Sequence, residues 1–416
     1  MADQKLQEKN TLYAPVFTDD WYEQSLYPLA EWLNGMAFKD FEFAPKGRPV
    51  IKIAEIKNGI SGQTKFTNEE YDSKYLLKKG DMLFCWSGQP ETSIDFFWWD
   101  GPEGWLNQHI FKVTPNLENK YFFFYLLKYL KPNFVQIAIN KQTTGLGHVT
   151  KGDLERFIVK LPKPKEQHAI AAMLSSLDDK IELLLEQNKT LEATAQAIFK
   201  EWFINFNFPS STGKMVDSEL GEIPEGWRVD RLSKIIEFEG GSQPPKNEHI
   251  YEPKPSYVRF IQNRDYADIS HLTFIRENKK NKLCDELDIM MDKYGDVGTP
   301  RYGLAGAYNV ALAKIVPRIK FSREYLRLYF FQPAIIGLLS SSAQASTRGS
   351  LNSGTFDGLD IVLPDEKTMR LFEELHLVFL KKAMLNNRRI QTISALRDTL
   401  LPKLMKGEVR VKGFND

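Results

Sequence analysis

Cysteine is scarce in this sequence of 416 residues, and there is no marked excess of charge of one sign. The two cysteines, Cys85 and Cys284, lie far apart and outside any C-x-x-C pair, which argues against disulfides and zinc and favours a reducing, cytoplasmic environment. The formal net charge is only +1, whereas a protein that grips duplex DNA alone usually shows a basic excess. A role on DNA would therefore require clustered basic residues, or a partner that supplies phosphate contacts.

Long hydrophobic runs are also missing. No window approaches the roughly 18 uninterrupted apolar residues of a membrane-spanning helix, and the N-terminal sequence MADQKLQEKN is polar, unlike a signal peptide. We therefore expect no membrane partner. Apolar residues make up 42% of the chain, which is enough for substantial cores, and the length predicts at least two domains.

Motifs of catalysis are absent as well. The chain has no Walker A loop and no Asn/Asp-Pro-Pro-aromatic tetrapeptide, the usual mark of amino-methyl transfer; Gln243-Pro-Pro-Lys246 comes nearest but lacks the aromatic residue. Pro364-Asp-Glu-Lys367 resembles part of a nuclease core without its downstream acid–x–Lys partner, so we interpret it as the start of a helix. The six histidines show no metal-ligand spacing. These absences predict that the chain has no catalytic residue and no metal site.

What the sequence does contain is a long internal repeat. Three stretches of the first half align with three of the second: Trp21–Leu33 with Trp227–Glu239, Lys120–Leu127 with Glu324–Phe331, and Gln142–Pro162 with Gln344–Pro364. The period of about 200 residues is far above the roughly 20 to 50 residues of solenoid repeats. Each copy is therefore a whole domain with its connector, and a duplicated domain typically recognises a target that has two halves.

Each copy ends in a segment whose apolar residues recur at alternating steps of four and three. Sustained for more than four heptads in the first copy, this pattern predicts a coiled coil. In the second copy, His376 and Arg397 interrupt it. The positions that define this heptad seam are Ile170, Leu174, Leu177, Ile181, Leu184, Asn188, Leu191, Ala195, Ile198 and Trp202 in the first copy, and Phe372, Phe379, Ala383, Asn386, Ile390, Ile393, Leu400 and Leu404 in the second.

Two arrangements of these helices are open. Each helix could pack on its own domain, but a helix of about 40 residues is about 60 Å long, longer than the domain that it would cover. Pairing of the two helices is therefore favoured, and the linker and domain between them make an antiparallel, approximately twofold arrangement the simplest one. If the centres of the seams coincide, the numbers of facing residues sum to 574 and Asn188 faces Asn386, although other registers are possible.

Several motifs resemble those of the specificity subunit of a type I restriction–modification system. The stretch Leu161-Pro-Lys-Pro-Lys-Glu-Gln167 is similar to the family's start of its first conserved helix. The second copy departs from this pattern, because Pro364-Asp-Glu-Lys367 stands where Pro-Glu-Gln is expected, so the start of its helix is less well defined. Further similar stretches are Leu177–Ile181, Leu191–Phe203, Gly221–Trp227 and, near the C-terminus, Leu400–Arg410.

This resemblance implies an α+β fold class, with two target-recognition domains in a tandem pseudo-twofold repeat joined by a long antiparallel two-helix coiled-coil spacer. It implies a DNA sequence-specificity subunit that reads a bipartite site in double-stranded DNA and is not itself catalytic. The expected partners are two modification (methyltransferase) subunits, which methylate adenine, and restriction/translocase subunits. S-adenosylmethionine, ATP and Mg are expected on those partners, and no cofactor on this chain. Two rival functions stay open: a duplicated DNA-modifying enzyme (nuclease or methyltransferase), and a structural tether that binds proteins.

The same interpretation divides the chain into seven parts. These are an N-terminal tail (1–20), target-recognition domain 1 (21–164), spacer helix 1 (165–205), a linker (206–226), target-recognition domain 2 (227–364), spacer helix 2 (365–407) and a C-terminal tail (408–416). Local patterns predict a strand over Val50–Ile56, a turn and strand over Gly80–Trp86, and a helix over Tyr121–Leu130 that Lys131-Pro132 ends.

Direct readout of bases requires forked or amide side chains on exposed loops. Two loops in each copy are candidates; alternatively, they are glycine-rich turns without a ligand, and Trp86 and Trp98-Trp99 belong to the domain core. Arg301 is predicted to read guanine and Tyr302 to contact a sugar edge. The candidate DNA-binding residues are Gln89, Lys141, Gln142, Thr143, Thr144 and His148 in the first copy, and Arg264, Lys293, Tyr294, Arg301, Tyr302, Gln344, Ser346, Thr347 and Arg348 in the second.

Overall fold

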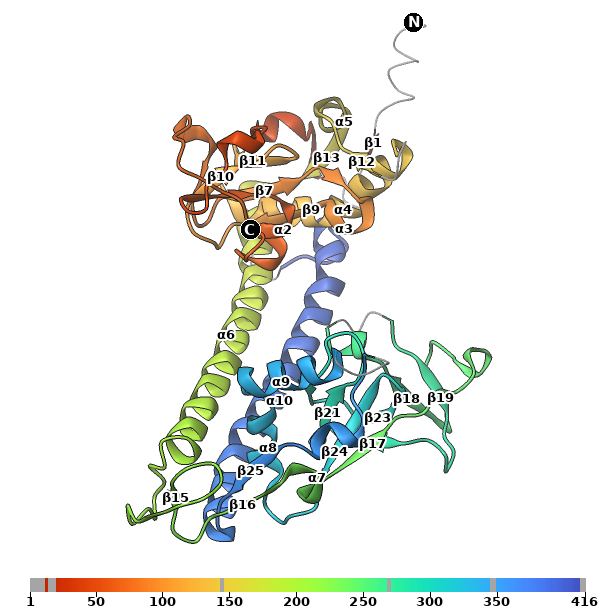
Figure 1. Ribbon diagram of the computed structural model, residues 1–416. Coiled ribbons are helices and arrows are strands. Elements are labelled where there is room, and N and C mark those ends of the chain that lie inside the picture. Colours follow the sequence, from red (N-terminus) through yellow and green to blue (C-terminus); the bar gives the residue numbers. More distant parts are fainter. Residues whose placement is uncertain (1–11, 14–19, 143–145, 268–270, 345–348, 412–416) are drawn as a thin grey trace, which may run out of the picture. The chain divides into compact units, whose positions relative to one another are not determined.

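The computed structural model describes residues 12–13, 20–142, 146–267, 271–344 and 349–411. The chain divides into two compact units, of which unit 1 comprises residues 1–183 and 390–416 and unit 2 comprises residues 184–389. Two long helices, α6 (Pro164–Phe203) and α10 (Glu366–Met405), each contribute one half to unit 1 and the other half to unit 2 (Figure 1).

Unit 1 is built on two four-stranded sheets and a smaller three-stranded one. The first sheet has the order β3 (Ala30–Asn34), β11 (Ile110–Pro115), β7 (Met82–Cys85), β9 (Asp95–Trp98); the second has the order β5 (Phe66–Thr67), β4 (Arg48–Ile51), β10 (Gly104–Leu106), β6 (Leu76–Leu77). The third joins β1 (Leu12–Tyr13), β13 (Phe157–Leu161) and β2 (Tyr22–Ser25). The remaining elements are α2 (Ile53–Asn58), α3 (Pro90–Ser93), α4 (Lys120–Asn140), α5 (Lys151–Arg156) and the pair β8 (Ser87–Gly88) and β12 (Gly147–His148).

Unit 2 repeats this arrangement. Its sheets have the orders β17 (Ile236–Gly240), β24 (Leu312–Pro317), β21 (Ile289–Asp292), β22 (Pro300–Arg301) and β19 (Phe274–Arg276), β18 (Tyr257–Ile261), β23 (Gly306–Tyr308), β20 (Leu283–Cys284). Two-stranded pairs join β16 (Arg228–Arg231) to β25 (Asp360–Leu363) and β14 (Met215–Val216) to β15 (Ile223–Pro224). The helices of this unit outside α6 and α10 are α7 (Leu232–Ile235), α8 (Arg323–Phe330) and α9 (Pro333–Gln344). The two units therefore share one α+β fold, as the sequence repeat predicts.

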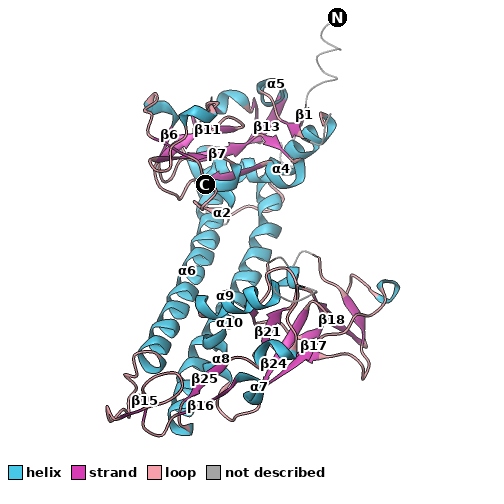
Figure 2. Cartoon of the chain, in the orientation of Figure 1, coloured by secondary structure: helices cyan, strands magenta, loops and turns pink. Residues whose placement is uncertain are grey.

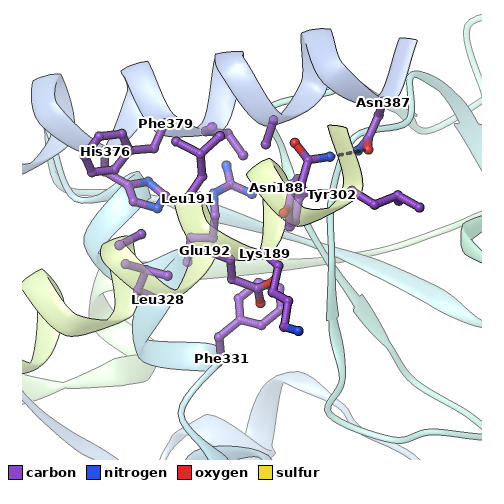
Figure 3. A pocket seen from close by; sticks show the side chains of 15 residues that line it. Asn188, Lys189, Leu191, Glu192, Tyr302, Leu328, Phe331, His376, Phe379 and Asn387 are labelled. Carbon is purple, nitrogen blue, oxygen red and sulfur yellow. Dashed lines mark hydrogen bonds between the residues drawn. The ribbon is translucent and has the colours of Figure 1, made fainter. Parts of the chain in front are cut away.

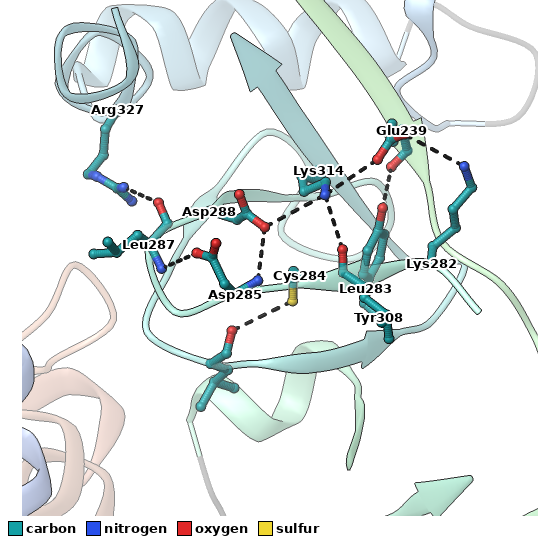
Figure 4. Close-up of polar contacts among 11 residues, drawn as sticks. Glu239, Lys282, Leu283, Cys284, Asp285, Leu287, Asp288, Tyr308, Lys314 and Arg327 are labelled. Carbon is teal, nitrogen blue, oxygen red and sulfur yellow. Dashed lines mark hydrogen bonds and ion pairs between the residues drawn. The ribbon is translucent and has the colours of Figure 1, made fainter. Parts of the chain in front are cut away.

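A half-buried lysine connects the two four-stranded sheets in both units. In unit 1, the Nζ of Lys112 lies 2.8 Å from a carboxylate oxygen of Asp81 and donates to the carbonyl of Leu76 in β6. In unit 2, the Nζ of Lys314 lies 3.7 Å from a carboxylate oxygen of Asp288 and 3.5 Å from one of Glu239, and it donates to the carbonyl of Leu283 in β20 (Figure 4). Because the same ion pair recurs at the same place in the topology, it belongs to the shared framework rather than to either copy alone.

Each unit's hydrophobic core extends from its sheets across a helix to α6 and α10. In unit 1, Phe84 stacks on Phe96 with ring centroids 4.3 Å apart, and the same core includes the α4 phenylalanines, Ile170 of α6 and Leu404 of α10. In unit 2, α8 and α9 lie on the side of the sheets that faces α10 (Figure 2), and the core includes Phe199 of α6 and Phe372 of α10.

Within each unit the halves of α6 and α10 pack in antiparallel directions. In unit 1, Asp178 accepts a 2.6 Å hydrogen bond from Arg397. In unit 2, Asn386 Nδ2 donates to Asn188 Oδ1 at 2.9 Å, and the rings of Trp202 and Phe372 have centroids 5.6 Å apart. Asn188 and Asn386 are the pair that the sum of 574 places face to face, and every predicted seam residue is buried or half-buried.

Both helices begin at equivalent positions of the repeat despite the departure in the second copy. Pro164 opens α6 and Glu366 opens α10. Asp365, which directly precedes α10, accepts hydrogen bonds from the backbone N–H and the hydroxyl of Thr368, so its carboxylate satisfies one of the donors that a helix N-terminus leaves unpaired. The interpretation of Pro364–Lys367 as a helix start is therefore confirmed.

Three local predictions need correction. The predicted tail contains strand β1, which pairs with β13. The predicted strand over 50–56 ends at Ile51, and α2 begins at Ile53, where the Glu55 carboxylate accepts from the N–H of Lys52. The predicted linker contains the β14–β15 pair, and Phe208 within it packs on Trp227 with centroids 4.9 Å apart. Strand pairing and burial thus stabilise the segments predicted as tail and linker, whereas a capped helix start ends the predicted strand.

The prediction that Lys131-Pro132 ends a helix is wrong for unit 1. Helix α4 continues through Pro132 to Asn140, with Phe134 and Ala138 fully buried beyond the proline. Proline removes one backbone hydrogen bond, but burial of the apolar side chains on both sides outweighs that loss. At the matching place in unit 2 the helix does break, because α8 ends at Phe330 and Pro333 opens α9.

The asparagine pair allows a direct test of helix register. Asn386 is fully buried, so we expect Asn386→Leu or Asn188→Leu alone to destabilise the chain by about 1–3 kcal/mol, since each leaves the other amide short of a partner. The double change should cost less than the sum of the two singles, because it removes both polar groups together. Denaturant unfolding of the four proteins measures this coupling, and strict additivity would contradict the pairing.

A buried ionic cluster joins α8 to α10 in unit 2. Glu324 is fully buried and accepts a 2.9 Å hydrogen bond from Arg327 Nε, while its Oε2 lies 2.7 Å from His376 Nδ1. Burial by itself would raise the pKa of Glu324, but the hydrogen bonds from His376 and Arg327 lower it to about 2. The carboxylate is therefore held in its charged form.

The lowered pKa of Glu324 predicts how the stability of the protein depends on pH. Because the folded-state pKa of Glu324 lies below its ordinary value of 4.5, the carboxylate's stabilising effect is complete above pH 4.5 and is lost as the pH falls towards 2. We expect Glu324→Gln to be markedly less stable than wild type at neutral pH, and the difference in unfolding free energy to shrink between pH 4.5 and 2. Glu366→Gln, at an exposed position, is the control. A difference in unfolding free energy between Glu324→Gln and wild type that does not change with pH would contradict the assignment.

Candidate nucleic-acid interface

The two candidate loops of the first copy are brought together by the pair β8–β12. Gly147 lies opposite Gly88 and His148 opposite Ser87, and the N–H of Val149 donates to the carbonyl of Trp86 at 2.9 Å. Gly147 passes close to α4, because an added Cβ would lie 2.3 Å from the carbonyl oxygen of Ala138. The sequence indicated the two loops as separate candidates. In the structure, the β8–β12 pair joins them into one surface.

The side chains of this surface differ in exposure. Gln89 and Gln142 are exposed, His148 is half-buried, and Leu146 is 59% exposed. Thr143 and Thr144 lie outside the described residues. Trp86 and Trp98 pack against the core and Trp99 is buried, which favours the core interpretation of these tryptophans. Gln89 and Gln142 are therefore the described glutamine candidates of this surface whose side chains are exposed.

Asp153 holds the base of the loop that begins at Lys141. Its buried carboxylate accepts hydrogen bonds from Lys141 Nζ, from the N–H and hydroxyl of Thr150, and from Arg156 at 2.9 Å. Burial opposes ionisation, but the hydrogen bonds from Lys141 and Thr150 outweigh it and lower the pKa of Asp153. Lys141 thus anchors the loop instead of projecting towards a ligand.

The second copy lacks this ionic anchor. Asn352 and Thr355 form the corresponding turn, a capping box closed by neutral side chains. Because unit 2 forms the same strand orders without it, the carboxylate of Asp153 is not a requirement of the fold. It is a property of one loop, and therefore of the surface that this loop helps to form.

Arg301 is engaged inside unit 2. Its Nε and Nη2 donate to Asp292 at 3.2 and 2.8 Å, and Nη2 also lies 3.4 Å from Asp296. Asp292 is buried, and this burial raises its pKa despite the opposing effect of Arg301. The guanidinium therefore neutralises a buried carboxylate, and few of its N–H donors remain for a guanine.

Tyr302 faces the interior rather than the open surface. The guanidinium of Arg327 lies 5.2 Å from its ring centroid, Phe331 meets it edge-on at 6.0 Å, and burial raises the pKa of Tyr302. This position does not suit the predicted contact with a sugar edge. Lys293 is half-buried near the rings of Phe238 and Tyr294.

The remaining candidates of the second copy are on or outside the surface. Tyr294 and Arg264 are exposed, with Arg264 Nε 3.8 Å from Asp265. Gln344 is exposed at the last position of α9, as Gln142 is just after α4. Ser346, Thr347 and Arg348 lie outside the described residues. Gln142 and Gln344 thus keep the equivalent places that the repeat predicts.

One cationic surface was not singled out from the sequence. Arg276, Lys279 and Lys280, at and after the end of β19, are exposed and form no ion pair with the residues that the structure describes. Tyr251, near the bridge that pairs Ile250 with Phe274, is 72% exposed. The sequence does contain a signal for this surface, namely the run of basic residues between two short strands. The sequence-based prediction relied on glycine-rich loops and did not include this run.

Two further findings concern chemistry and membranes. Among the described residues, no three His, Cys, Asp or Glu side chains come together in a way that could hold a metal ion. Across the same residues, none of the helices has both the length and the apolar character required to span a bilayer.

Comparison with known proteins gives a consistent result. The family described as the type I restriction modification DNA specificity domain matches at residues 18–193 and again at 224–394. The specificity subunit of the type I restriction enzyme HindI from Haemophilus influenzae is 21% identical, and the alignment covers 94% of this chain and 100% of that protein. The MjaIX specificity subunit from Methanocaldococcus jannaschii is 29% identical over 271 residues, which is 62% of each protein.

A solved structure shows the same fold. The crystal structure of a type I restriction-modification system S subunit from M. genitalium has a TM-score of 0.57 and 15% sequence identity, and the match covers 94% of this chain and 98% of that one. Since the family matches in both copies and over most of the residues, this chain belongs to the type I restriction modification DNA specificity domain family and carries that domain twice.

Proposed function

We propose that this chain is the DNA sequence-specificity subunit of a multi-subunit type I restriction–modification complex. In this proposal each unit reads one half of a bipartite site in double-stranded DNA. The paired helices act as the coiled-coil spacer between the two half-sites. The chain places adenine-methylating modification subunits, two of them, and restriction subunits on the DNA, and it has no catalytic role. S-adenosylmethionine, ATP and Mg would be bound by those partners.

The observation that carries this proposal is one framework repeated with different loops. Both units have the same strand orders and the same lysine bridge, Lys112 in one and Lys314 in the other. Their loops differ in the residues that matter for recognition: Leu146 corresponds to Arg348, and Asp153 to Thr355. A shared framework with divergent loops is what two readers of different half-sites require, since loop side chains specify bases.

The near-neutral charge supports a role inside a complex. With a net charge of +1, the chain offers little general attraction for phosphates, which dominates affinity for DNA. We therefore expect the modification subunits to supply much of the phosphate contact. The rival functions are disfavoured, because an enzyme would need catalytic motifs that this sequence lacks, and a protein tether would not need two divergent loop sets.

Methylome sequencing of cells with and without this gene tests the proposal. We expect adenine methylation at one bipartite motif, with an unspecified gap between its halves, to disappear when the gene is deleted. A motif without a gap, or a methylome unchanged by the deletion, would contradict the proposed function.

Single-residue variants test whether the glutamines of the β8–β12 surface contact bases. We expect Gln142→Ala or Gln89→Ala to relax the motif at one or two positions of a single half-site, since a bidentate contact provides about 1–3 kcal/mol of discrimination. Gln136→Ala, an equally exposed glutamine on α4, is the matched control. Relaxation in both half-sites, or in neither, would show that these amides do not read bases.

The sequence predicts that Arg301→Ala relaxes the second half-site, and the structure adds a second effect. Removing the guanidinium leaves the buried carboxylate of Asp292 without its ion-pair partner and with the Asn263 amide as its remaining side-chain donor among the described residues, so we expect unit 2 to lose about 1–3 kcal/mol of stability. Thermal unfolding of the full chain measures this loss. A variant with unchanged stability and a relaxed motif would instead assign Arg301 to base reading alone.

A heptad insertion tests whether the helices set the gap. Seven residues inserted after Leu183 and seven after Arg389 preserve the seam and add about 10 Å to each helix. We expect the methylated motif to keep its half-site letters and to lengthen its gap by about three base pairs, at 3.4 Å of duplex per step. Insertion of four residues at each place breaks the seam and serves as the control; an unchanged gap after the heptad insertion would contradict the spacer role.

A further inference from the structure

Unit 2 contains a cavity of about 360 Å³ at the junction of α6, α8 and α10. Figure 3 shows Leu191 and Glu192 of α6, His376 and Phe379 of α10, and Tyr302 arranged around it. Two seam positions that line the cavity are alanines, Ala195 and Ala383, where most of the seam carries larger side chains. The small side chains leave space that the packing of the helices does not fill.

The cavity wall includes a buried cation that lacks a full set of partners. Arg327 is 1% exposed; its Nε and Nη2 donate to Glu324, and Nη2 also donates to the carbonyl of Leu287. Its Nη1 is buried and has no hydrogen-bond partner among the described residues. A buried N–H group of a charged side chain is destabilising when it has no acceptor, so an acceptor from outside the chain would stabilise this donor.

The first copy shows that the fold does not require this arrangement. The stretch that aligns with the region of Arg327 is Phe122-Phe123-Phe124, and all three side chains are buried in an apolar core. The position that aligns with His376 is Leu174, which is also fully buried. Unit 2 has therefore replaced filled apolar packing by a cavity with a charged wall.

The chemistry of the wall restricts what could fit. Its apolar part comes from leucine, alanine and phenylalanine side chains, and its charged lining residues are Arg327, Lys189 and Glu192, of which Arg327 also pairs with the buried Glu324. Pockets of this size, mainly apolar with a few directed polar groups, are typical of small-molecule sites. A carboxylate on a short apolar or aromatic body would satisfy Nη1 and bury its body against Leu191 and Phe379.

We propose that this cavity binds a small carboxylic acid, whose carboxylate pairs with Arg327 Nη1 and whose apolar body bridges α6 and α10. The bound acid would stabilise the packing of α8 against the two helices. No reaction is involved; the site is a binding site that contributes to the stability of unit 2.

The test uses the full chain and two matched probes, 3-phenylpropionate and the neutral 3-phenyl-1-propanol. We expect saturable binding of the acid by titration calorimetry, a melting temperature that rises with its concentration, and at least about tenfold weaker binding of the alcohol, because a hydrogen bond to a charged group contributes about 1.5–3 kcal/mol. This comparison requires no variant. Absence of saturable binding, or equal affinity for the two probes, overturns the proposal.

A cavity-filling variant locates the binding site. Ala383→Leu adds a side chain at the lining, so we expect it to weaken binding of 3-phenylpropionate at least about tenfold, since the cavity would no longer admit the probe. Ala197→Leu, which adds the same atoms at an exposed position of α6, should bind like wild type. Unchanged binding by a folded Ala383→Leu protein would place the probe elsewhere and overturn the assignment.

Discussion

The packing of α6 against α10 is the interaction on which the rest of the structure depends. Each unit's core includes side chains from both helices: Ile170 and Leu404 in unit 1, and Phe199 and Phe372 in unit 2. Unit 1 is therefore completed by residues near the C-terminus, and unit 2 by residues from the middle of the chain. Since apolar burial is the main favourable term in folding, neither core forms fully until the two helices have found their register.

Polar groups along the helices make that register specific. Apolar seam positions would tolerate a shift of one heptad, because each offers a similar surface to the next. The pair Asn188–Asn386 and the ion pair Asp178–Arg397 satisfy one another in a single alignment only, and a shift would leave the buried Asn386 without its partner. The residues that weaken the heptad pattern therefore define which alignment the helices adopt.

The same division between shared and individual features runs through both units. The strand orders and the lysine bridges of Lys112 and Lys314 recur, and they build the framework. The individual features are ionic: Asp153 anchors a loop in unit 1, Arg301 compensates Asp292 in unit 2, and Glu324 joins α8 to α10. These charged side chains anchor parts of their own unit, and only charged side chains that are not used in this way remain available to read a ligand.

Periodicity in the sequence was sufficient to predict the two-copy organisation and the two long helices, because the heptad seam and the repeat are properties of residue spacing. It offered the observed register as one of several, and the pair Asn188–Asn386 shows which one the structure has. Local signals failed where burial competed with them, as at Pro132, where Phe134 and Ala138 keep α4 continuous, and in the predicted linker, where Phe208 packs on Trp227.

For the candidate site, residue type predicted the loops but not the use of each side chain. Lys141 and Arg301 have the chemistry of DNA-reading residues, yet each is paired with a buried carboxylate that lies 12 and 9 residues away, respectively. Gln89 and Gln142 meet on one surface only because β8 pairs with β12. Spacing along the chain thus determined the architecture, whereas the partners of individual charges were decided by the tertiary structure, because desolvation of an acid depends on everything packed around it.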